Sequence, residues 1–215
     1  MIINILAGGP KNLVPNLSEY LDEKSIWVGV DRGVFDLLER KIIPSIAFGD
    51  FDSVTIEEMA EIECMVDHLN RFKPEKDETD LELALNWAIE QNPEEIRLFG
   101  ASGGRLDHFF ANVQLLIKPV LARKNTNITL IDRGNSIFLK GPGRYSISKE
   151  INKKYISFVP VTMDVTNLTL KGFKYPLNNC HISLGSTLCI SNELVDDVGT
   201  FSFSEGILIV VRSQD

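Results

Sequence analysis

The feature that most constrains the fold of this 215-residue chain is a series of short apolar runs, each followed at once by glycine or acidic residues. In the first part of the chain the runs are nearly continuous, a pattern typical of strands buried on both faces of a parallel sheet. They span residues 2–7, 25–30, 45–48, 64–69, 96–99 and 128–131. Open α/β sheets bind ligands outside the carboxyl ends of their strands. We therefore expect the residues that follow these runs to line one rim.

Stretches with helical periodicity separate several of the runs. Between residues 81 and 89, apolar side chains recur at the i, i+3, i+4, i+7 and i+8 positions, and Asn92-Pro93 predicts the end of the helix. The same spacing recurs over residues 109–117, before Pro119. This alternation predicts a doubly wound, mostly parallel α/β domain with flanking helices over residues 1–132.

The remainder of the chain, residues 133–215, is rich in β-branched residues and glycine turns and has no convincing helical pattern. Candidate strands recur about every 8 to 12 residues, which favours an all-β sandwich or barrel-like domain. They span residues 136–139, 144–147, 155–160, 165–170, 181–184, 187–191, 199–203 and 207–212. We expect the domain boundary within residues 132–135.

Composition argues against several classes of protein. The formal net charge is -8 and the sequence shows no basic patch, so we expect no nucleic-acid partner. No apolar run approaches the roughly 18 residues that a spanning helix needs, and residues 1–6 lack the basic flank and the length of a signal peptide. The three cysteines show no CxxC spacing and are expected to be apolar packing residues or surface thiols of no special role. These features predict a soluble, cytoplasmic protein with no membrane partner.

Two aspartates follow the third apolar run, in the segment Gly49-Asp50-Phe51-Asp52-Ser53. Their side chains point the same way in an extended segment, and two ionised carboxylates roughly 4 Å apart repel by about 4 kcal/mol at an effective dielectric of about 20. A divalent cation removes this repulsion, and Mg²⁺ usually binds through one or two carboxylates plus substrate phosphates. Asx turns at the end of a strand are the alternative explanation.

A second acidic segment, Lys76-Asp77-Glu78-Thr79-Asp80, precedes the first predicted helix. Thr79 and Glu82 have the spacing of a capping box, and an acid such as Asp80 is favourable in the first helical turn. Helix capping alone explains much of this segment. The nearby acidic pair and the adjacent Lys76 support a functional role as the second hypothesis.

The segment from Gly100 to Asp107 connects a buried strand to a helix and is rich in glycine. Its backbone amides could hold phosphate oxygens, and Arg105 adds a planar fork of hydrogen-bond donors. The segment is neither a Walker A loop nor a GxGxxG fingerprint, but it matches the GxSxG pattern with Ser102 as a hydrolase nucleophile. Only His181 follows in the usual hydrolase order, and it lies in the other expected domain, so the hydrolase is the weaker hypothesis.

Taken together, these motifs resemble thiamine pyrophosphokinases. Four segments stand in that family's order and spacing, namely residues 49–53, 76–81, 103–108 and 191–193, and the Gly8-Gly9 pair and the Asp31-Arg32-Gly33 turn extend the resemblance over the whole chain. The resemblance implies a homodimer whose thiamine sites lie at the subunit interface. It also implies Mg²⁺-dependent transfer of the diphosphate of ATP to the thiamine hydroxyl, which gives thiamine diphosphate and AMP.

The resemblance also implies roles for individual residues. Catalysis is expected of Asp50, Asp52, Asp80, Arg105 and Asp107, and Mg²⁺ binding of Asp50, Asp52 and Asp80. ATP binding is expected of Gly8, Gly9, Asp31, Arg32, Lys76, Gly103, Gly104 and Arg105, and thiamine binding of Asp80, Asp107, Ser191 and Asn192. The general base stays open between Asp80 and Asp107. The aromatic partner of the thiamine pyrimidine stays open among Phe173, Phe201 and Phe203.

Two further alternatives stand beside the hydrolase. One is a pyrophosphokinase that acts on another hydroxymethyl heterocycle, such as a pterin. The other is a protein that binds thiamine or a nucleotide without turnover.

Overall fold

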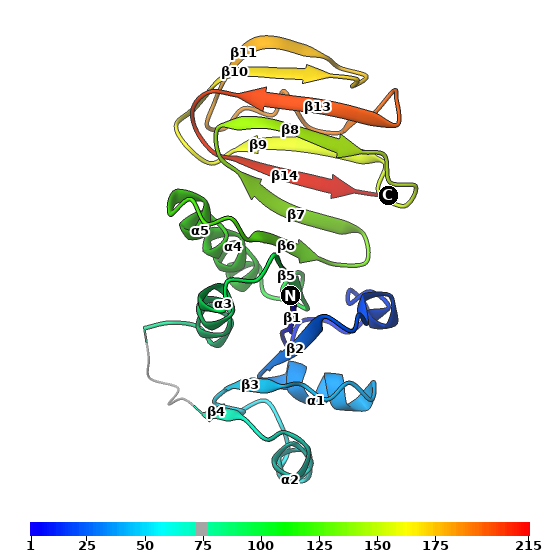
Figure 1. Cartoon of the computed structure of the whole chain (residues 1–215), viewed down its shortest axis with the longest axis vertical. Helices are drawn as coiled ribbons and strands as arrows, with labels where there is room; N and C mark the ends of the chain where they lie inside the picture. Colours follow the sequence, from blue (N-terminus) through cyan, green and yellow to red (C-terminus); the bar gives the residue numbers. More distant parts are fainter. Residues whose placement is uncertain (72–76) are drawn as a thin grey trace. The chain divides into compact units, whose positions relative to one another are not determined.

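The computed structural model describes residues 1–71 and 77–215. Two compact units make up this part of the chain (Figure 1). The first contains Met1–Leu115 and Asn125–Arg133, and the second contains Leu116–Lys124 and Gly134–Asp215. That residues 1–132 and 133–215 are separate domains stays a prediction.

Parallel strands form the centre of the first unit. They lie in the order β6-β5-β1-β2-β3-β4, and every neighbouring pair is parallel. Their bounds are β1 (Ile2–Leu6), β2 (Ser25–Val30), β3 (Ile46–Gly49), β4 (Leu69–Arg71), β5 (Glu95–Phe99) and β6 (Asn127–Ile131). Because the chain extends from β1 toward β4 on one side and from β5 to β6 on the other, the strand order reverses between β1 and β5. This is the point at which doubly wound folds bind their ligands.

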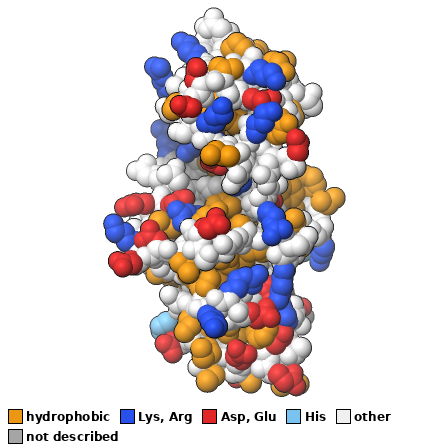
Figure 2. Space-filling model, turned by 90° about the vertical axis from the view of Figure 1, so that its right-hand side faces the viewer, with side chains coloured by type: hydrophobic (Ala, Val, Ile, Leu, Met, Phe, Trp, Pro, Cys, Tyr) orange, Lys and Arg blue, Asp and Glu red, His pale blue; other side chains and the backbone are white. Residues whose placement is uncertain are grey.

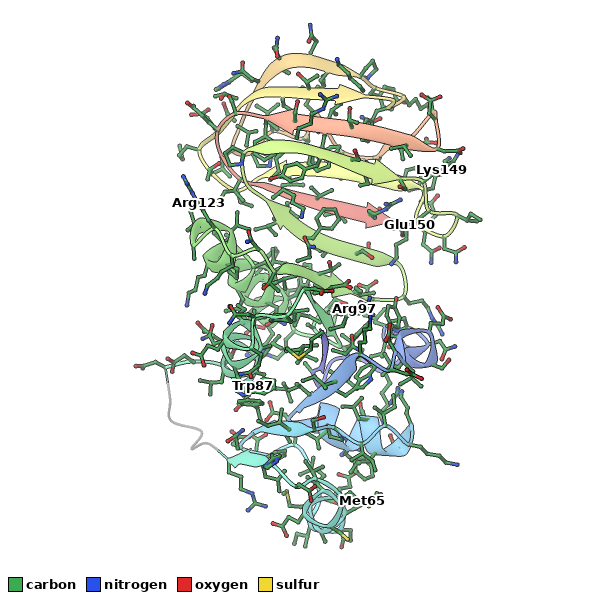
Figure 3. All side chains as sticks on the ribbon, in the orientation of Figure 1. Met65, Trp87, Arg97, Arg123, Lys149 and Glu150 are labelled. Carbon is green, nitrogen blue, oxygen red and sulfur yellow. The ribbon has the colours of Figure 1, made fainter. Side chains whose placement is uncertain are left out.

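Helices cover the strands of the first unit on both sides. They are α1 (Arg32–Glu39), α2 (Ile56–Met65), α3 (Asp80–Glu90) and α4 (Leu106–Leu115), with the 3-10 turn η1 (Leu17–Tyr20). Figure 1 shows α1 on one side of the strands and α3 with α4 on the other. Trp87 of α3 packs against Phe48 of β3 with ring centroids 5.9 Å apart (Figure 3). This packing holds the second half of α3 against β3.

Two predictions for the first half were wrong in detail. Residues 64 and 65 end helix α2 rather than begin a strand, because Thr55 and Glu58 form a capping box that starts the helix at Ile56. The helix over residues 109–117 ends at Leu115, and a separate helix, α5 (Ile117–Leu121), contains Pro119. Proline is tolerated there because it lies in the first turn, where backbone N–H groups have no helical partner.

The second unit is a sandwich of two antiparallel layers. One layer has the order β12-β9-β14-β7 and the other the order β11-β10-β13-β8. The bounds are β7 (Asn135–Lys140), β8 (Gly143–Ser148), β9 (Tyr155–Pro160), β10 (Asp164–Lys171), β11 (Leu177–Ser183), β12 (Asn192–Glu193), β13 (Val198–Phe203) and β14 (Leu208–Ser213). Phe158 of one layer and Phe201 of the other meet in a shared core, with ring centroids 5.0 Å apart. The predicted fold class, an α/β part followed by a β-sandwich, is confirmed.

One predicted strand of the second unit is absent from the described structure. Residues 187–191 form turns, and the chain becomes extended only at β12. Ser191 has a positive φ of 56°, a conformation that a regular strand does not contain. Among the helices in residues 1–71 and 77–215, none is long and apolar enough to span a membrane.

Candidate functional site

The loops that follow β1, β2 and β5 contact one another at the carboxyl edge of the parallel strands. Gly9 N donates a 2.9 Å hydrogen bond to Gly100 O, and a Cβ atom on Gly9 would lie 2.3 Å from that oxygen. A Cβ atom on Gly33 would lie 2.1 Å from Leu6 O. Side chains do not fit at such distances, so these glycines allow the loops to close on each other. The rim predicted from the sequence is therefore present.

The carboxylate of Asp31 reaches from the end of β2 to the end of β3. Asp31 N donates a 2.9 Å hydrogen bond to Phe48 O, and Asp31 Oδ1 lies 2.2 Å from the place that a Cβ atom on Gly49 would occupy. Asp31 itself has a positive φ of 49°, which is costly for a residue other than glycine and is concentrated at functional sites. The structure thus brings Asp31 next to the residue that precedes Asp50.

Asp50 and Asp52 lie in the turn that follows β3. Asp52 N donates a 3.1 Å hydrogen bond to Asp50 Oδ1, so the Asx turn predicted as the alternative is present. Phe51, with a positive φ of 60°, is 6% exposed and packs in a core cluster with α1 and α2. Burial of Phe51 leaves Asp52 exposed and Asp50 partly exposed on either side of it. The turn uses Asp50 Oδ1 and is compatible with a metal role for the remaining carboxylate oxygens.

Asp80 is the first residue of α3, and the N-cap prediction for Thr79 is confirmed because Thr79 Oγ1 accepts a 3.2 Å hydrogen bond from Glu82 N. Within residues 1–71 and 77–215, no three acidic, histidine or cysteine side chains are grouped closely enough to hold a metal ion. The set Asp50, Asp52 and Asp80 is therefore not assembled as a three-carboxylate site here and stays a prediction for the nucleotide complex. Lys76 lies outside the described residues.

Two buried polar side chains anchor the loop that follows β5. Ser102 Oγ donates a 2.8 Å hydrogen bond to Asp132 Oδ2, and Asn112 Nδ2 of α4 donates a 2.9 Å hydrogen bond to Ala101 O. Ser102 is 5% exposed and its described partner is a carboxylate rather than a histidine. These contacts do not support the prediction of Ser102 as a hydrolase nucleophile, since a nucleophile needs access to substrate and a nearby base.

The anchored loop then turns outward through glycines and presents Arg105. Gly103 and Gly104 have positive φ values of 75° and 64°, which glycine adopts without steric cost. Arg105 Nη2 lies 2.6 Å from Asp107 Oδ2 and Arg105 Nε lies 3.2 Å from Asp107 Oδ1, a bidentate pair. The pair lies at the surface, with side chains 73% and 64% exposed. Arg105 is thus oriented and accessible.

The contact between Arg105 and Asp107 shifts the pKa of both side chains and stabilises their charged forms. The hydrogen bond from Arg105 lowers the pKa of Asp107 to about 2, and the hydrogen bond to Asp107 raises the pKa of Arg105. A carboxylate with so low a pKa is a weak base at neutral pH. In this arrangement Asp107 is suited to orient the guanidinium rather than to remove a proton.

Arg32 is engaged by neighbouring residues at the start of α1. Its Nη1 lies 2.5 Å from Glu58 Oε2 of α2, and its guanidinium carbon lies 5.1 Å from the centroid of the Phe35 ring. The hydrogen bond from the backbone of Thr55 and the one from Arg32 lower the pKa of Glu58. A direct role of Arg32 in ATP binding, which stays a prediction, would have to share the guanidinium with Glu58.

In the second unit, Ser191 and Asn192 differ in what they expose. Asn192 is 2% exposed, its Oδ1 accepts a 3.0 Å hydrogen bond from Tyr175 N, and its Nδ2 donates a 2.8 Å hydrogen bond to Tyr175 O. Ser191 is exposed, and its backbone N donates a 2.9 Å hydrogen bond to Ser157 Oγ. The Asn192 side chain therefore shapes the backbone, whereas the Ser191 side chain is available to a ligand.

Sequence reasoning missed several residues that hold the rim in place, namely Lys11, Asp36, Asn112 and Asp132. The available signals were weak. Lys11 directly follows Gly8-Gly9-Pro10, and Asp36 is an acid that the α1 sequence places among buried apolar residues.

A doubly wound sheet with glycine loops, acids and an exposed arginine at its carboxyl edge defines an α/β protein with a candidate phosphate-binding rim. Comparison with known proteins agrees. A family model described as "Thiamin pyrophosphokinase, catalytic domain" matches residues 17–130, and one described as "Thiamin pyrophosphokinase, vitamin B1 binding domain" matches residues 144–208. The thiamine pyrophosphokinase of Bacillus subtilis (strain 168) is 57% identical over 213 residues, which cover 99% of each chain.

Solved structures show the same likeness. The crystal structure of thiamine pyrophosphokinase from Bacillus subtilis has a TM-score of 0.95 at 56% identity and covers 100% of both chains. The thiamin pyrophosphokinase from Geobacillus thermodenitrificans has a TM-score of 0.92 at 52% identity and covers 100% of this chain and 98% of that one. This chain belongs to the thiamine pyrophosphokinase family, which makes it an enzyme of the pyrophosphotransferase kind.

Proposed function

We propose that this protein transfers the diphosphate of ATP to the hydroxyl group of thiamine and releases AMP and thiamine diphosphate. Family membership over both units supports this reaction. The structural observation that carries the proposal is the contact between the Asp31 carboxylate and Gly49, because it brings two acidic strand ends together beside the glycine loops. In the reaction the hydroxyl oxygen of thiamine bonds to the β-phosphorus of ATP, and the bond from that phosphorus to the oxygen that leaves with AMP breaks.

The residues at the ends of β2 and β3 suit Mg²⁺. Mg²⁺ prefers oxygen ligands and usually binds protein carboxylates together with substrate phosphates, so the carboxylates need not be grouped before the nucleotide binds. Asp50, Asp52 and Asp80 would hold the ion, with Asp31 nearby. When bound, Mg²⁺ would neutralise phosphate charge and align the triphosphate.

The chain's own donors would bind and orient the rest of the triphosphate. The loops that contain Gly8, Gly9, Gly103 and Gly104 lie at the carboxyl edge, where phosphate oxygens bind in doubly wound folds. Gly9 N is bonded to Gly100 O, so Gly9 would shape the loop for ATP rather than donate to it. Arg105, held by Asp107, would stabilise the charge on the transferred phosphates. The proton of the thiamine hydroxyl would pass to a carboxylate, and the choice stays open between Asp80 and Asp107. Arg105 lowers the basicity of Asp107, and a bound Mg²⁺ would lower that of Asp80. Lys76 remains a proposed ATP ligand.

The thiamine contacts and the assembly are proposed from the family resemblance. Ser191, with its exposed side chain, and the backbone that Asn192 shapes would contact thiamine, together with Asp80 and Asp107. We propose a homodimer with its active sites at the subunit interface, and a cytoplasmic location.

A substrate-exchange assay tests the proposed function. The protein is incubated with MgATP and either thiamine or a hydroxymethylpterin, and AMP and the diphosphate product are measured. AMP and thiamine diphosphate in equal amounts are expected with thiamine. Product with the pterin alone would favour the other pyrophosphokinase. Tight thiamine binding without AMP release would favour a binding protein.

A further inference from the structure

Lys11 lies between two acids of α1. Its Nζ atom is 2.9 Å from Asp36 Oδ1 and 2.5 Å from Glu39 Oε2. The Glu39 and Lys11 side chains are 46% and 49% exposed, whereas Asp36 is 2% exposed. Hydrogen bonds to Glu39 and then to Asp36 raise the pKa of the Lys11 ammonium group, so it stays charged at neutral pH. The loop after β1 is therefore tied to α1 by one buried and one exposed ion pair.

Asp36 also faces Arg32, one turn earlier on α1. Arg32 Nε lies 3.8 Å from Asp36 Oδ1, and a Cβ atom on Gly8 would lie 3.0 Å from Arg32 Cβ. Arg32 continues the network to Glu58 of α2. The buried carboxylate thus has a cation from the Gly8-Gly9 loop on one side and a cation from its own helix on the other.

The net charge of this network favours a structural role, in which it holds the loop after β1 against α1, over a second phosphate-binding site. Lys11 and Arg32 contribute two positive charges, and Asp36, Glu39 and Glu58 contribute three negative charges, so the sum is -1. A net negative group repels phosphate. On the face shown in Figure 2, basic and acidic side chains likewise lie among one another.

We propose that Asp36 is a positioning residue that fixes the Gly8-Gly9 loop through Lys11. A buried carboxylate without a close cation is strongly unfavourable. If the loop after β1 lifts away from α1, Lys11 leaves, and the cation that remains near Asp36 among the described residues is Arg32, whose Nε lies 3.8 Å away. Burial of Asp36 therefore favours the loop conformation in which Gly9 is bonded to Gly100. The consequence for ATP rests on the proposed function, whereas the loop restraint itself does not.

Three single variants of the full-length chain test this inference. Lys11→Met and Asp36→Asn remove the buried pair, and Glu39→Gln is the matched control because it removes only the exposed partner of the same ammonium group. Hydrogen exchange of the peptide covering residues 7–13 is measured by mass spectrometry without substrates. We expect exchange at least roughly 10-fold faster in Lys11→Met and Asp36→Asn and a change below about 2-fold in Glu39→Gln. Loop exchange that is unchanged in both pair variants would overturn the proposal.

Steady-state kinetics give the functional part of the test. The KM for MgATP should rise about 10-fold in Lys11→Met and Asp36→Asn, while kcat and the KM for thiamine change less than about 3-fold. The double variant should be no worse than the more affected single variant. Lys11 is half exposed, so Lys11→Met decides the question if Asp36→Asn does not fold. An inactive wild-type protein would refute the proposed function, whereas an active protein with unaffected Lys11→Met would refute only the positioning role.

Discussion

Ser102 Oγ donates a 2.8 Å hydrogen bond to Asp132 Oδ2, and both residues are buried, at 5% and 7% exposure. The bond joins the loop after β5 to the residue that follows β6. It assigns the serine of the GxSxG segment a structural task, because the hydroxyl points into the protein. The glycines that follow then carry Arg105 to the surface.

Replacement of Ser102 by alanine should lower the stability of the protein moderately without abolishing its activity. Loss of a buried hydrogen bond to a carboxylate costs about 1–3 kcal/mol of unfolding free energy. Loosening of the loop should lower kcat/KM about 3- to 10-fold. Urea unfolding and the diphosphate-transfer assay measure both effects. Ser146→Ala, at an exposed position of β8, is the control and should change neither. A stable Ser102→Ala protein with no residual activity would instead support a nucleophilic serine.

Replacement of Gly49 by alanine should disrupt the site with little effect on the rest of the fold. The new Cβ atom would lie 2.2 Å from Asp31 Oδ1, so the carboxylate must move. We expect kcat/KM to fall by at least about 10-fold because misplaced charges lose much of their effect. Gly185→Ala is the matched control, since Gly185 also has a positive φ, of 88°, but an added Cβ atom would have no described atom within 4 Å. Normal activity of Gly49→Ala would show that the Asp31 position is unimportant.

The Asp107 carboxylate should titrate far below its ordinary pKa of 3.8, near 2, because Arg105 stabilises its charged form. A depressed pKa gives stability that is present above the unfolded value and is lost as pH falls from 3.8 toward about 2. Both side chains are exposed, so the effect on stability is small. Carbon-13 NMR titration of the carboxyl group measures the midpoint.

Arg105→Gln should return the Asp107 midpoint toward 3.8. Arg123→Gln, at another exposed arginine, should leave it unchanged. A wild-type midpoint close to 3.8 would mean that the bidentate pair does not persist in solution.

Asn192→Ala should act mainly on stability. The buried Asn192 side chain bonds to Tyr175 N, Tyr175 O and Glu193 N, and alanine leaves these partly buried backbone groups without that partner. We expect a loss of about 2–4 kcal/mol in unfolding free energy. Ser191→Ala, at the neighbouring exposed residue, should change stability by less than about 0.5 kcal/mol but raise the KM for thiamine. If the thermal unfolding of Asn192→Ala matches that of the wild type, the hydrogen bonds from Asn192 to Tyr175 contribute little to stability.

Most of the fold could be predicted because the buried strands carry their own signal. The runs at β1, β2, β5 and β6 are nearly continuous and apolar, and their alternation with helical patterns indicates a doubly wound, mostly parallel layer. The strand predicted over residues 64–69 was wrong because the first residues of this run belong to the end of helix α2, and β4 begins only at Leu69. The capping box of Thr55 and Glu58 indicates where α2 begins but not where it ends, so the apolar run was the stronger signal in the sequence.

The candidate site was only partly predictable. The sequence places Asp31, Asp50 and Arg105 after strands, and strand order brings those ends to one edge. It does not show that Asp31 occupies the space beside Gly49, that Asn192 turns its amide inward, or that Arg32 pairs with Glu58. Such contacts join residues distant in the chain, and their partners become visible only after folding.

Intact transfer of a diphosphate unit can be followed with ATP labelled with ³²P at the β-phosphate, in the presence of Mg²⁺ and thiamine. We expect the label to move entirely into thiamine diphosphate, with unlabelled AMP formed in equal amount. Asp50→Asn should greatly slow the transfer. Label that remains in ADP, or thiamine that stays unmodified in a folded protein, would contradict intact transfer of the diphosphate.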